Sequence, residues 1–228
     1  MNRLILFDID GTLLSGGPAK DAFHQGLLSV FGTAGPIEAW EFSGKTDPQI
    51  ARELLREAGL EDPHIDEGFP RLWENYLRDL EALVPERPFR SLLGVTSLLE
   101  ALEAEAWARL GLLTGNLEGG ARVKLRSAEI RVPFAVGAFG SDREERNDLP
   151  PVAMSRASRI WGEPLPPEEV VIVGDTPRDV ECGLAHGTRT VGVATGRFSA
   201  DELARAGAHL VLDDLTDTAE VLRHLRDC

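Results

Sequence analysis

The sequence predicts an α/β protein with a doubly wound, mostly parallel, Rossmann-like sheet and a small α-helical cap inserted after the first strand. Two observations indicate the sheet. Short apolar runs alternate with helical patterns along most of the chain, and several of these runs are apolar throughout, as in strands buried on both faces. A third observation indicates the cap, because the segment between the first and second strands is much longer than one crossover helix needs.

The strands and helices of the core follow one another in a regular order. Strands are predicted at the apolar runs Arg3–Phe7, Ala108–Leu113, Phe134–Ala138, Val170–Val173, Thr190–Ala194 and His209–Leu212. Helices are predicted where apolar residues recur at helical spacing, at Leu117–Ser127, Val152–Trp161, Pro177–His186 and Asp217–Arg226. This alternation builds a parallel sheet with helices on both faces.

Residues 16–88 form the predicted cap, between core segments 1–15 and 89–228. Helical patterns within it cover Ala19–Phe31, Pro48–Glu57 and Ile65–Ala82. The last of these has an apolar stripe, which favours packing in a core over stacking on a ligand: Phe69, Leu72, Trp73, Tyr76, Leu77 and Leu80. Because the cap leaves the core just after the first strand, we expect it to cover a site at that strand's end, as a lid does.

The composition excludes several classes of partner. The chain has 228 residues, of which 43% are hydrophobic and 27% charged, as is ordinary for a folded soluble protein. A formal net charge of −14 argues against nucleic acid or an anionic membrane as the main partner. Cys182 and Cys228 provide no disulfide framework, and no apolar run is long enough to span a bilayer. We expect a cytoplasmic monomer or weak homodimer that acts on a small molecule.

Two carboxylates end the first strand. Asp8 and Asp10, in the segment Asp8-Ile9-Asp10-Gly11-Thr12, would share one face if the strand stayed extended. At the carboxyl end of a strand they would form a hard-oxygen site suited to Mg²⁺, where ligands of α/β sheets bind. A capped strand that ends in a solvated turn is the alternative for this motif alone.

Two more polar segments follow strands at the same edge. Thr114-Gly115-Asn116 offers a hydroxyl and backbone N–H groups at a helix N-terminus, which suits phosphate but also makes a good turn and N-cap. Asp175 ends the fourth strand, and Asp179 follows in the first helical turn, where the helix macrodipole alone would favour an acid. Four carboxylates gathered at two strand ends would repel one another, so a divalent cation is expected between them.

Together these segments resemble motifs one, two and four of the haloacid-dehalogenase-like hydrolase superfamily. The matching segments are Asp8-Ile9-Asp10-Gly11-Thr12, Thr114-Gly115-Asn116 and Gly174-Asp175-Thr176-Pro177-Arg178-Asp179. Their order and spacing match over essentially the whole chain, and the helical insertion resembles that superfamily's small α-helical cap. The segment Gly44-Lys45-Thr46-Asp47 resembles a cap loop of the phosphoglycolate-phosphatase-like branch.

The resemblance implies a Mg²⁺-dependent phosphatase that hydrolyses a small phosphorylated metabolite, a phosphoglycolate-like phosphomonoester, through an aspartyl-phosphate intermediate. Asp8 would be the nucleophile, and Asp10 would protonate the leaving group and then activate water. The metal ligands would be Asp8, the backbone carbonyl of Asp10, Asp175 and, through water, Asp179.

The resemblance also assigns residues to the substrate. Thr114 and the N–H of Gly115 would hold the phosphoryl oxygens, with Asn116 beside them. Lys45 and Thr46 in the cap loop would contact the rest of the substrate. The alternative for Lys45 is a surface position beside an N-capping Thr46 or Asp47.

The third motif departs from the family pattern. The family has a Lys followed by Pro, whereas this chain has Arg143-Glu144-Glu145-Arg146-Asn147-Asp148-Leu149-Pro150-Pro151, and no Lys follows Lys124. Counting back from Asp175 puts the usual Lys at Asn147. We predict that the neighbouring Arg146 replaces it, although a planar guanidinium is not equivalent to an ammonium. The alternative is that Arg143 and Arg146 balance nearby acids on a solvated loop.

Three other functions compete with the phosphatase. A dehalogenase of the same superfamily needs no metal, and the acids Asp10, Asp175 and Asp179 argue against it. A sugar phosphomutase would return the phosphate to its substrate. A non-catalytic protein that binds a phosphorylated ligand would be consistent with the missing Lys.

Overall fold

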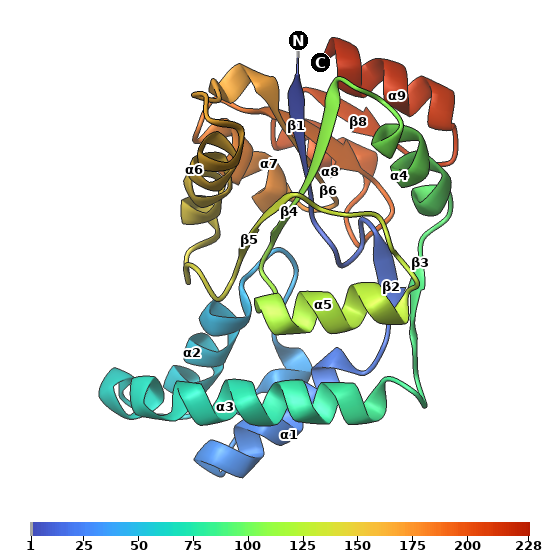
Figure 1. Ribbon diagram of the computed structural model, residues 1–228. Coiled ribbons are helices and arrows are strands. Elements are labelled where there is room, and N and C mark those ends of the chain that lie inside the picture. The colour runs from blue at the N-terminus through green and yellow to red at the C-terminus, as the bar shows by residue number, and fades with distance from the viewer. Residues whose placement is uncertain (1) are drawn as a thin grey trace.

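A six-stranded parallel sheet forms the core of the protein, in a computed structural model that describes residues 2–228 (Figure 1). The strand order is β5-β4-β1-β6-β7-β8. The chain fills one side of β1 with β4 and β5, and then crosses to the other side. The reversal leaves a crevice at the carboxyl ends of β1 and β6, where ligands of α/β sheets bind. The strands are β1 (Arg3–Phe7), β4 (Ala108–Thr114), β5 (Val136–Phe139), β6 (Val170–Gly174), β7 (Arg189–Val193) and β8 (Leu210–Leu212).

Helices cover both faces of the sheet because strand side chains alternate. In β1, Leu4 and Leu6 pack in one apolar cluster with α6 (Leu149–Trp161) and α7 (Pro177–Leu184). Ile5 and Phe7 belong to the cluster on the opposite face, with α4 (Val95–Glu103) and α9 (Thr218–Asp227). A further helix, α8 (Ala200–Arg205), lies against β7 and β8. A strand buried on both faces reads as a continuous apolar run, and this explains why the core strands were predictable.

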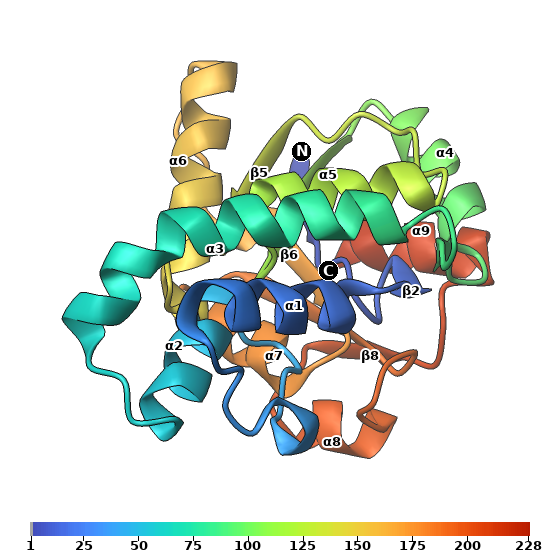
Figure 2. The same ribbon diagram turned by 90° about the horizontal axis from the view of Figure 1, so that it is seen from below.

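A helical layer lies at the carboxyl ends of the strands (Figures 1 and 2). It contains α1 (Ala19–Phe31), α2 (Asp47–Glu57) and α3 (Asp62–Leu83), and α5 (Glu118–Ser127) lies between α3 and the sheet. Helices α1 and α3 pack side by side. The predicted apolar stripe of α3 is confirmed as part of the core: Leu72, Tyr76 and Leu80 are buried, and Phe69, Trp73 and Leu77 pack partly buried against them.

A pair of short strands joins this layer to the sheet. Strands β2 (Leu14–Gly16) and β3 (Phe89–Ser91) pair antiparallel, with Gly16 opposite Phe89. They were not predicted, because three residues are too few to show a period of two. The chain therefore leaves and re-enters the core through one paired ribbon. We propose that residues 16–88 act as a cap on a core formed by residues 1–15 and 89–228.

The predicted core elements are observed with shifted ends. The strand predicted at Phe134–Ala138 begins at Val136, and the helix predicted at Val152–Trp161 begins at Leu149, since Pro150 and Pro151 fit a first helical turn. Short 3₁₀ helices cover Ile37–Ala39, Arg146–Asp148 and Pro167–Glu169. Among residues 2–228, no helix has both the length and the apolar character that crossing a bilayer requires.

Candidate active site

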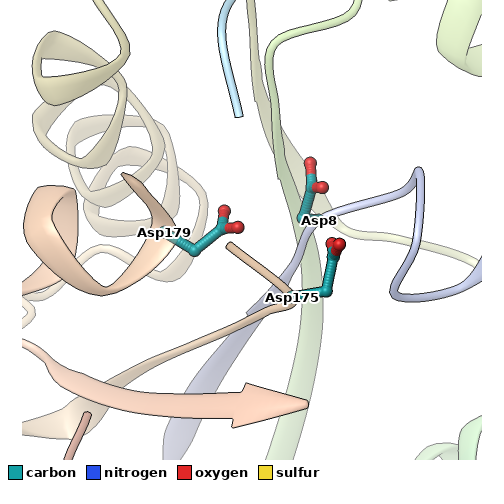
Figure 3. Close-up of side chains that lie close together, drawn as sticks. All are labelled: Asp8, Asp175 and Asp179. Carbon is teal, nitrogen blue, oxygen red and sulfur yellow. The ribbon is translucent and has the colours of Figure 1, made fainter. Parts of the chain in front are cut away.

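Three aspartates meet at the carboxyl ends of β1 and β6 (Figure 3). Asp8 follows β1, Asp175 follows β6, and Asp179 lies in the first turn of α7. One carboxylate oxygen of each lies within 4.8 Å of the other two. The three residues are only 5%, 4% and 2% exposed. Buried carboxylate oxygens at this separation are a donor set that fits a divalent cation such as Mg²⁺.

The local backbone explains how two of these side chains are held. Gly11 turns the chain after β1 with a φ of +83°, and a Cβ at this position would overlap the Asp175 carboxylate. Thr12 donates a hydrogen bond from Oγ1 to Oδ1 of Asp175 at 3.0 Å. Thr176 caps α7, and its N–H and hydroxyl both donate to Oδ2 of Asp179. Oδ2 of Asp179 therefore belongs to the cap of α7, while its other oxygen pairs with Arg146 at the site.

Burial and mutual repulsion shift the acidity of this cluster. Burial raises the pKa of Asp8 to about 6, against the opposing effect of Arg146. Burial, together with the charges of Asp179 and Asp8, raises the pKa of Asp175 to about 8. Both shifts mean that the ionised forms of Asp8 and Asp175 are unfavourable while Arg146 is the positive charge that offsets them. A bound cation would relieve this repulsion.

Cation binding should be visible without any activity assay. We expect saturating Mg²⁺ to raise the melting temperature of the chelator-treated protein by roughly 5–10 °C, as follows from a ligand at about 100 times its Kd. In Asp175→Asn the shift should disappear, while the metal-free variant melts no lower than the metal-free wild type because one repelling charge is gone. Asp213→Asn, at an exposed position, should keep the full shift. Equal shifts in both variants, measured by calorimetry, would place the Mg²⁺ elsewhere.

Arg146 is the basic residue of the third motif that enters the cluster. Its side chain is 5% exposed, Nη2 lies 3.1 Å from Oδ1 of Asp8, and Nη2 also pairs with Asp179. Although burial opposes the charge, Asp179 and Asp8 raise the pKa of Arg146 above its usual value. Its Nε has no hydrogen-bond partner within residues 2–228. Arg143 and Asn147, the other positions considered for this motif, are exposed.

The carboxylate of Asp10 lies outside the cluster of three and has its own cation. Lys124 of α5 donates to both Asp10 oxygens, at 2.8 and 2.7 Å, and Asn116 donates to Oδ2 at 2.7 Å. Lys124 is 4% exposed and was missed from the sequence. The signal was its position in the apolar stripe of its helix, which includes Leu117 and Ala121, because a lysine at a core position needs an acidic partner.

The segment after β4 lies beside Asp8 and Asp10. Thr114 is fully buried, and its Oγ1 accepts a hydrogen bond from Nδ2 of Asn116 at 2.8 Å. Gly115 touches the cap loop so closely that a Cβ would overlap the carbonyl of Lys45. Thr114, Gly115 and Asn116 all line one cavity with Asp8 and Asp175 of the cluster.

The two predicted cap residues have different positions. Lys45 lines the cavity, where it forms an ion pair with Glu53 of α2. Thr46 is fully buried, accepts a hydrogen bond from the Gln49 N–H as the N-cap of α2, and donates to the carbonyl of Glu144 at 2.5 Å. The hydroxyl of Thr46 therefore caps the helix and fixes the loop, and Thr46 is not among the residues that line the cavity, so its contact with substrate stays a prediction.

The cavity extends from the cluster of aspartates towards α1 and α3 and has a volume of about 490 Å³. This volume is in the range of sites for small molecules. Beyond the residues already described, its walls include Phe23, Phe42, Asp47, Ile50 and Tyr76. It therefore has a polar end at the sheet and a mixed apolar and polar end in the helical layer.

Comparison of sequences with known proteins identifies the family of the chain. Residues 148–218 match the family model described as HAD-hydrolase-like. The chain is 32% identical to the phosphoglycolate phosphatase of Xylella fastidiosa strain Temecula1 over 188 residues, which cover 81% of this chain and 77% of that protein. It is 28% identical to the phosphoglycolate phosphatase of Salmonella paratyphi A over 247 residues, covering 97% and 95%.

Solved structures share the fold. CbbY from Rhodobacter sphaeroides, in complex with phosphate, superimposes with a TM-score of 0.70 at 22% identity, covering 95% of this chain and 96% of that one. A hydrolase from Pseudomonas syringae gives a TM-score of 0.70, also at 22% identity, over 99% of both chains. With a curated relative 32% identical over 81% of the chain, and with the fold in agreement, the chain belongs to the haloacid-dehalogenase-like hydrolases, in the branch of the phosphoglycolate phosphatases.

Proposed function

We propose that the protein is a Mg²⁺-dependent phosphatase that hydrolyses a small phosphorylated metabolite through an aspartyl-phosphate on Asp8. Membership of this branch makes the chain a phosphoric monoester hydrolase. The observation that carries the mechanism is the position of Asp8, buried among two other carboxylates and Arg146 at the base of a cavity. Phosphoglycolate, which the relatives' name specifies, belongs in the first panel of substrates.

In the first half-reaction, a carboxylate oxygen of Asp8 attacks phosphorus, and the bond from phosphorus to the leaving oxygen breaks. A carboxylate needs no activating base for this step, because it is the ionised form that attacks. Arg146, Thr114 and the N–H of Gly115 hold the phosphoryl oxygens, and positioning together with charge supplies most of the catalysis. Mg²⁺, held by Asp8, the Asp10 carbonyl, Asp175 and Asp179, would offset the repulsion between nucleophile and phosphate.

Asp10 moves the protons. In its protonated form it delivers a proton to the leaving alkoxide, and in the second half-reaction the resulting carboxylate takes one from the water that attacks the phosphorus of the aspartyl-phosphate, so that Asp10 returns to its protonated form. This water restores the Asp8 carboxylate and releases inorganic phosphate. Lys124 and Asn116 fix the position of the Asp10 carboxylate through the three hydrogen bonds described above.

The test is release of phosphate from p-nitrophenyl phosphate, with and without Mg²⁺. We expect turnover with Mg²⁺ and loss of nearly all activity in excess EDTA, restored when Mg²⁺ is added back. A phosphomutase would convert a sugar phosphate into its isomer without releasing phosphate, and a binding protein would bind without either reaction. Undiminished release in EDTA would contradict the metal-dependent mechanism.

A further inference from the structure

The cavity that holds the proposed phosphate site contains no unpaired cation. Every lysine and arginine on its walls is ion-paired with a carboxylate, as far as residues 2–228 are concerned. The pairs are Lys20–Glu38, Lys45–Glu53, Lys124–Asp10, Arg197–Glu41 and Arg146 with Asp8 and Asp179. Beyond the phosphate, a substrate therefore meets no positive charge that lacks a partner.

Two of these pairs, Lys45–Glu53 and Lys124–Asp10, lie deep in the cavity and do not readily release their lysines to a substrate. The side chains of Lys45 and Glu53 are only 11% and 28% exposed, and Glu53 also accepts hydrogen bonds from Trp40 and Gln49. If Lys45 turned to a substrate carboxylate, Glu53 would be left as an uncompensated charge in a partly buried position. Lys124 is still more enclosed and holds both oxygens of Asp10.

Besides Asp175 of the metal cluster, one acid on the cavity wall has no ion pair among residues 2–228. Asp47 accepts the N–H of Leu117 at Oδ2, at 2.8 Å, and forms no ion pair within residues 2–228. Burial raises the pKa of Asp47 to about 6, against the opposing charge of Lys124, which is itself paired with Asp10, so the group is charged at pH 7.5. Its carboxylate gives the inner end of the cavity a negative charge and an acceptor oxygen for a hydroxyl group.

A hydroxyl group of the protein lies at the same end of the cavity. Tyr76 is 1% exposed and lines the cavity, and its hydroxyl has no hydrogen-bond partner among the described residues. Burial, with the charges of Asp47 and Asp10 nearby, raises the pKa of Tyr76 well above its usual value, so the phenol stays neutral. A buried phenol usually finds a partner, and a ligand in the cavity could supply one.

We propose that this cavity selects phosphomonoesters whose remaining part is uncharged and hydroxylated, and discriminates against those that carry a carboxylate. The inference rests on the proposed phosphatase activity and narrows its substrate class. Asp47 and Tyr76 recognise the substrate hydroxyl, and Asp47 repels a carboxylate, since like charges brought together in a site disfavour the wrong ligand. The chain would thereby differ from relatives whose name refers to phosphoglycolate, which ends in a carboxylate.

Two substrates with the same three-carbon skeleton test this inference. Glycerol 3-phosphate has a hydroxymethyl group where 3-phosphoglycerate has a carboxylate. With Mg²⁺ at pH 7.5, we expect kcat/KM to be about 10²-fold higher for glycerol 3-phosphate, because Asp47 accepts a hydrogen bond from its hydroxymethyl group but repels the carboxylate of 3-phosphoglycerate. A ratio near one, or a preference for 3-phosphoglycerate, would overturn the inference.

Three variants identify the groups responsible. Asp47→Asn keeps an acceptor for the Leu117 N–H but removes the charge, and it should raise kcat/KM for 3-phosphoglycerate about 10-fold. Glu53→Gln, which frees Lys45, should do the same. Tyr76→Phe should lower kcat/KM for glycerol 3-phosphate only. Glu38→Gln, at an exposed pair on the rim, is the control and should leave the ratio unchanged.

The outcomes distinguish a wrong substrate preference from a wrong assignment as a phosphatase. If p-nitrophenyl phosphate is hydrolysed normally while none of the three variants changes the substrate ratio, the inference is wrong and the phosphatase assignment stands. If the wild-type protein hydrolyses none of these esters with Mg²⁺, the proposed function fails, and the inference fails with it.

Discussion

Replacing Asp8 by asparagine should lower kcat for p-nitrophenyl phosphate by about 10⁴-fold or more, since removing the nucleophile of a catalytic unit disables the unit. Asparagine has almost the same shape, so the buried position between β1 and Arg146 should be kept. The amide, however, is not nucleophilic at neutral pH. Because a negative charge next to the substrate phosphate is also removed, KM should not rise.

The matched control is Asp213→Asn, an identical change at an exposed site, which should turn over like the wild type. A second readout is the mass of acid-quenched protein after mixing with substrate. The wild type should gain a phosphoryl group, and Asp8→Asn should not. Near-normal turnover in Asp8→Asn, or a phosphoryl adduct in that variant, would assign the nucleophile to another residue.

The sheet and the carboxylate cluster could be predicted because both depend on strong local signals. Arg3–Phe7 and Val170–Gly174 are buried on both faces and are therefore apolar at every position except Arg3. Parallel strands place their carboxyl ends at one edge of the sheet, so residues that follow β1 and β6 must come close together. The convergence of Asp8, Asp175 and Asp179 follows from this topology.

The parts that could not be predicted depend on contacts between distant segments. Lys124 reaches Asp10 across 114 positions of sequence, and the Leu117 N–H reaches Asp47 across 70. No periodicity in the sequence fixes how α5 and the cap loop sit over the first motif. The ion pairs of the cavity lysines and arginines, and the lack of one at Asp47, could be seen only when the side chains were placed.

Thr46 shows a different reason why the role of a residue could not be predicted from the sequence. A Ser or Thr before a helix is compatible with both capping and ligand binding, because its hydroxyl can accept or donate to either partner. The sequence left these alternatives open. The structure shows the capping role, since the hydroxyl accepts from the Gln49 N–H and donates to the Glu144 carbonyl, and Thr46 is not among the residues that line the cavity.

Replacing Arg146 by alanine should lower kcat about 10²–10³-fold, the usual effect of losing one contact that stabilises developing charge. In the structure Arg146 is the one basic side chain within residues 2–228 that pairs with Asp8. Without it, the negative charge around the transferring phosphoryl group would be offset by bound Mg²⁺ alone. Since the lost contact acts on charge in the transition state, kcat should fall more than KM rises.

Two further variants separate a catalytic role from a structural one. Arg146→Lys should retain part of the activity, because an ammonium supplies a point charge but no planar fork. Arg143→Ala, on the same loop but exposed, should change turnover little. If Arg146→Ala melts like the wild type with Mg²⁺ yet is strongly impaired in kcat, its effect lies in catalysis rather than in folding. Kinetics in which Arg143→Ala is the impaired variant would show that another cation serves the phosphoryl group, and the assignment of the third motif to Arg146 would be wrong.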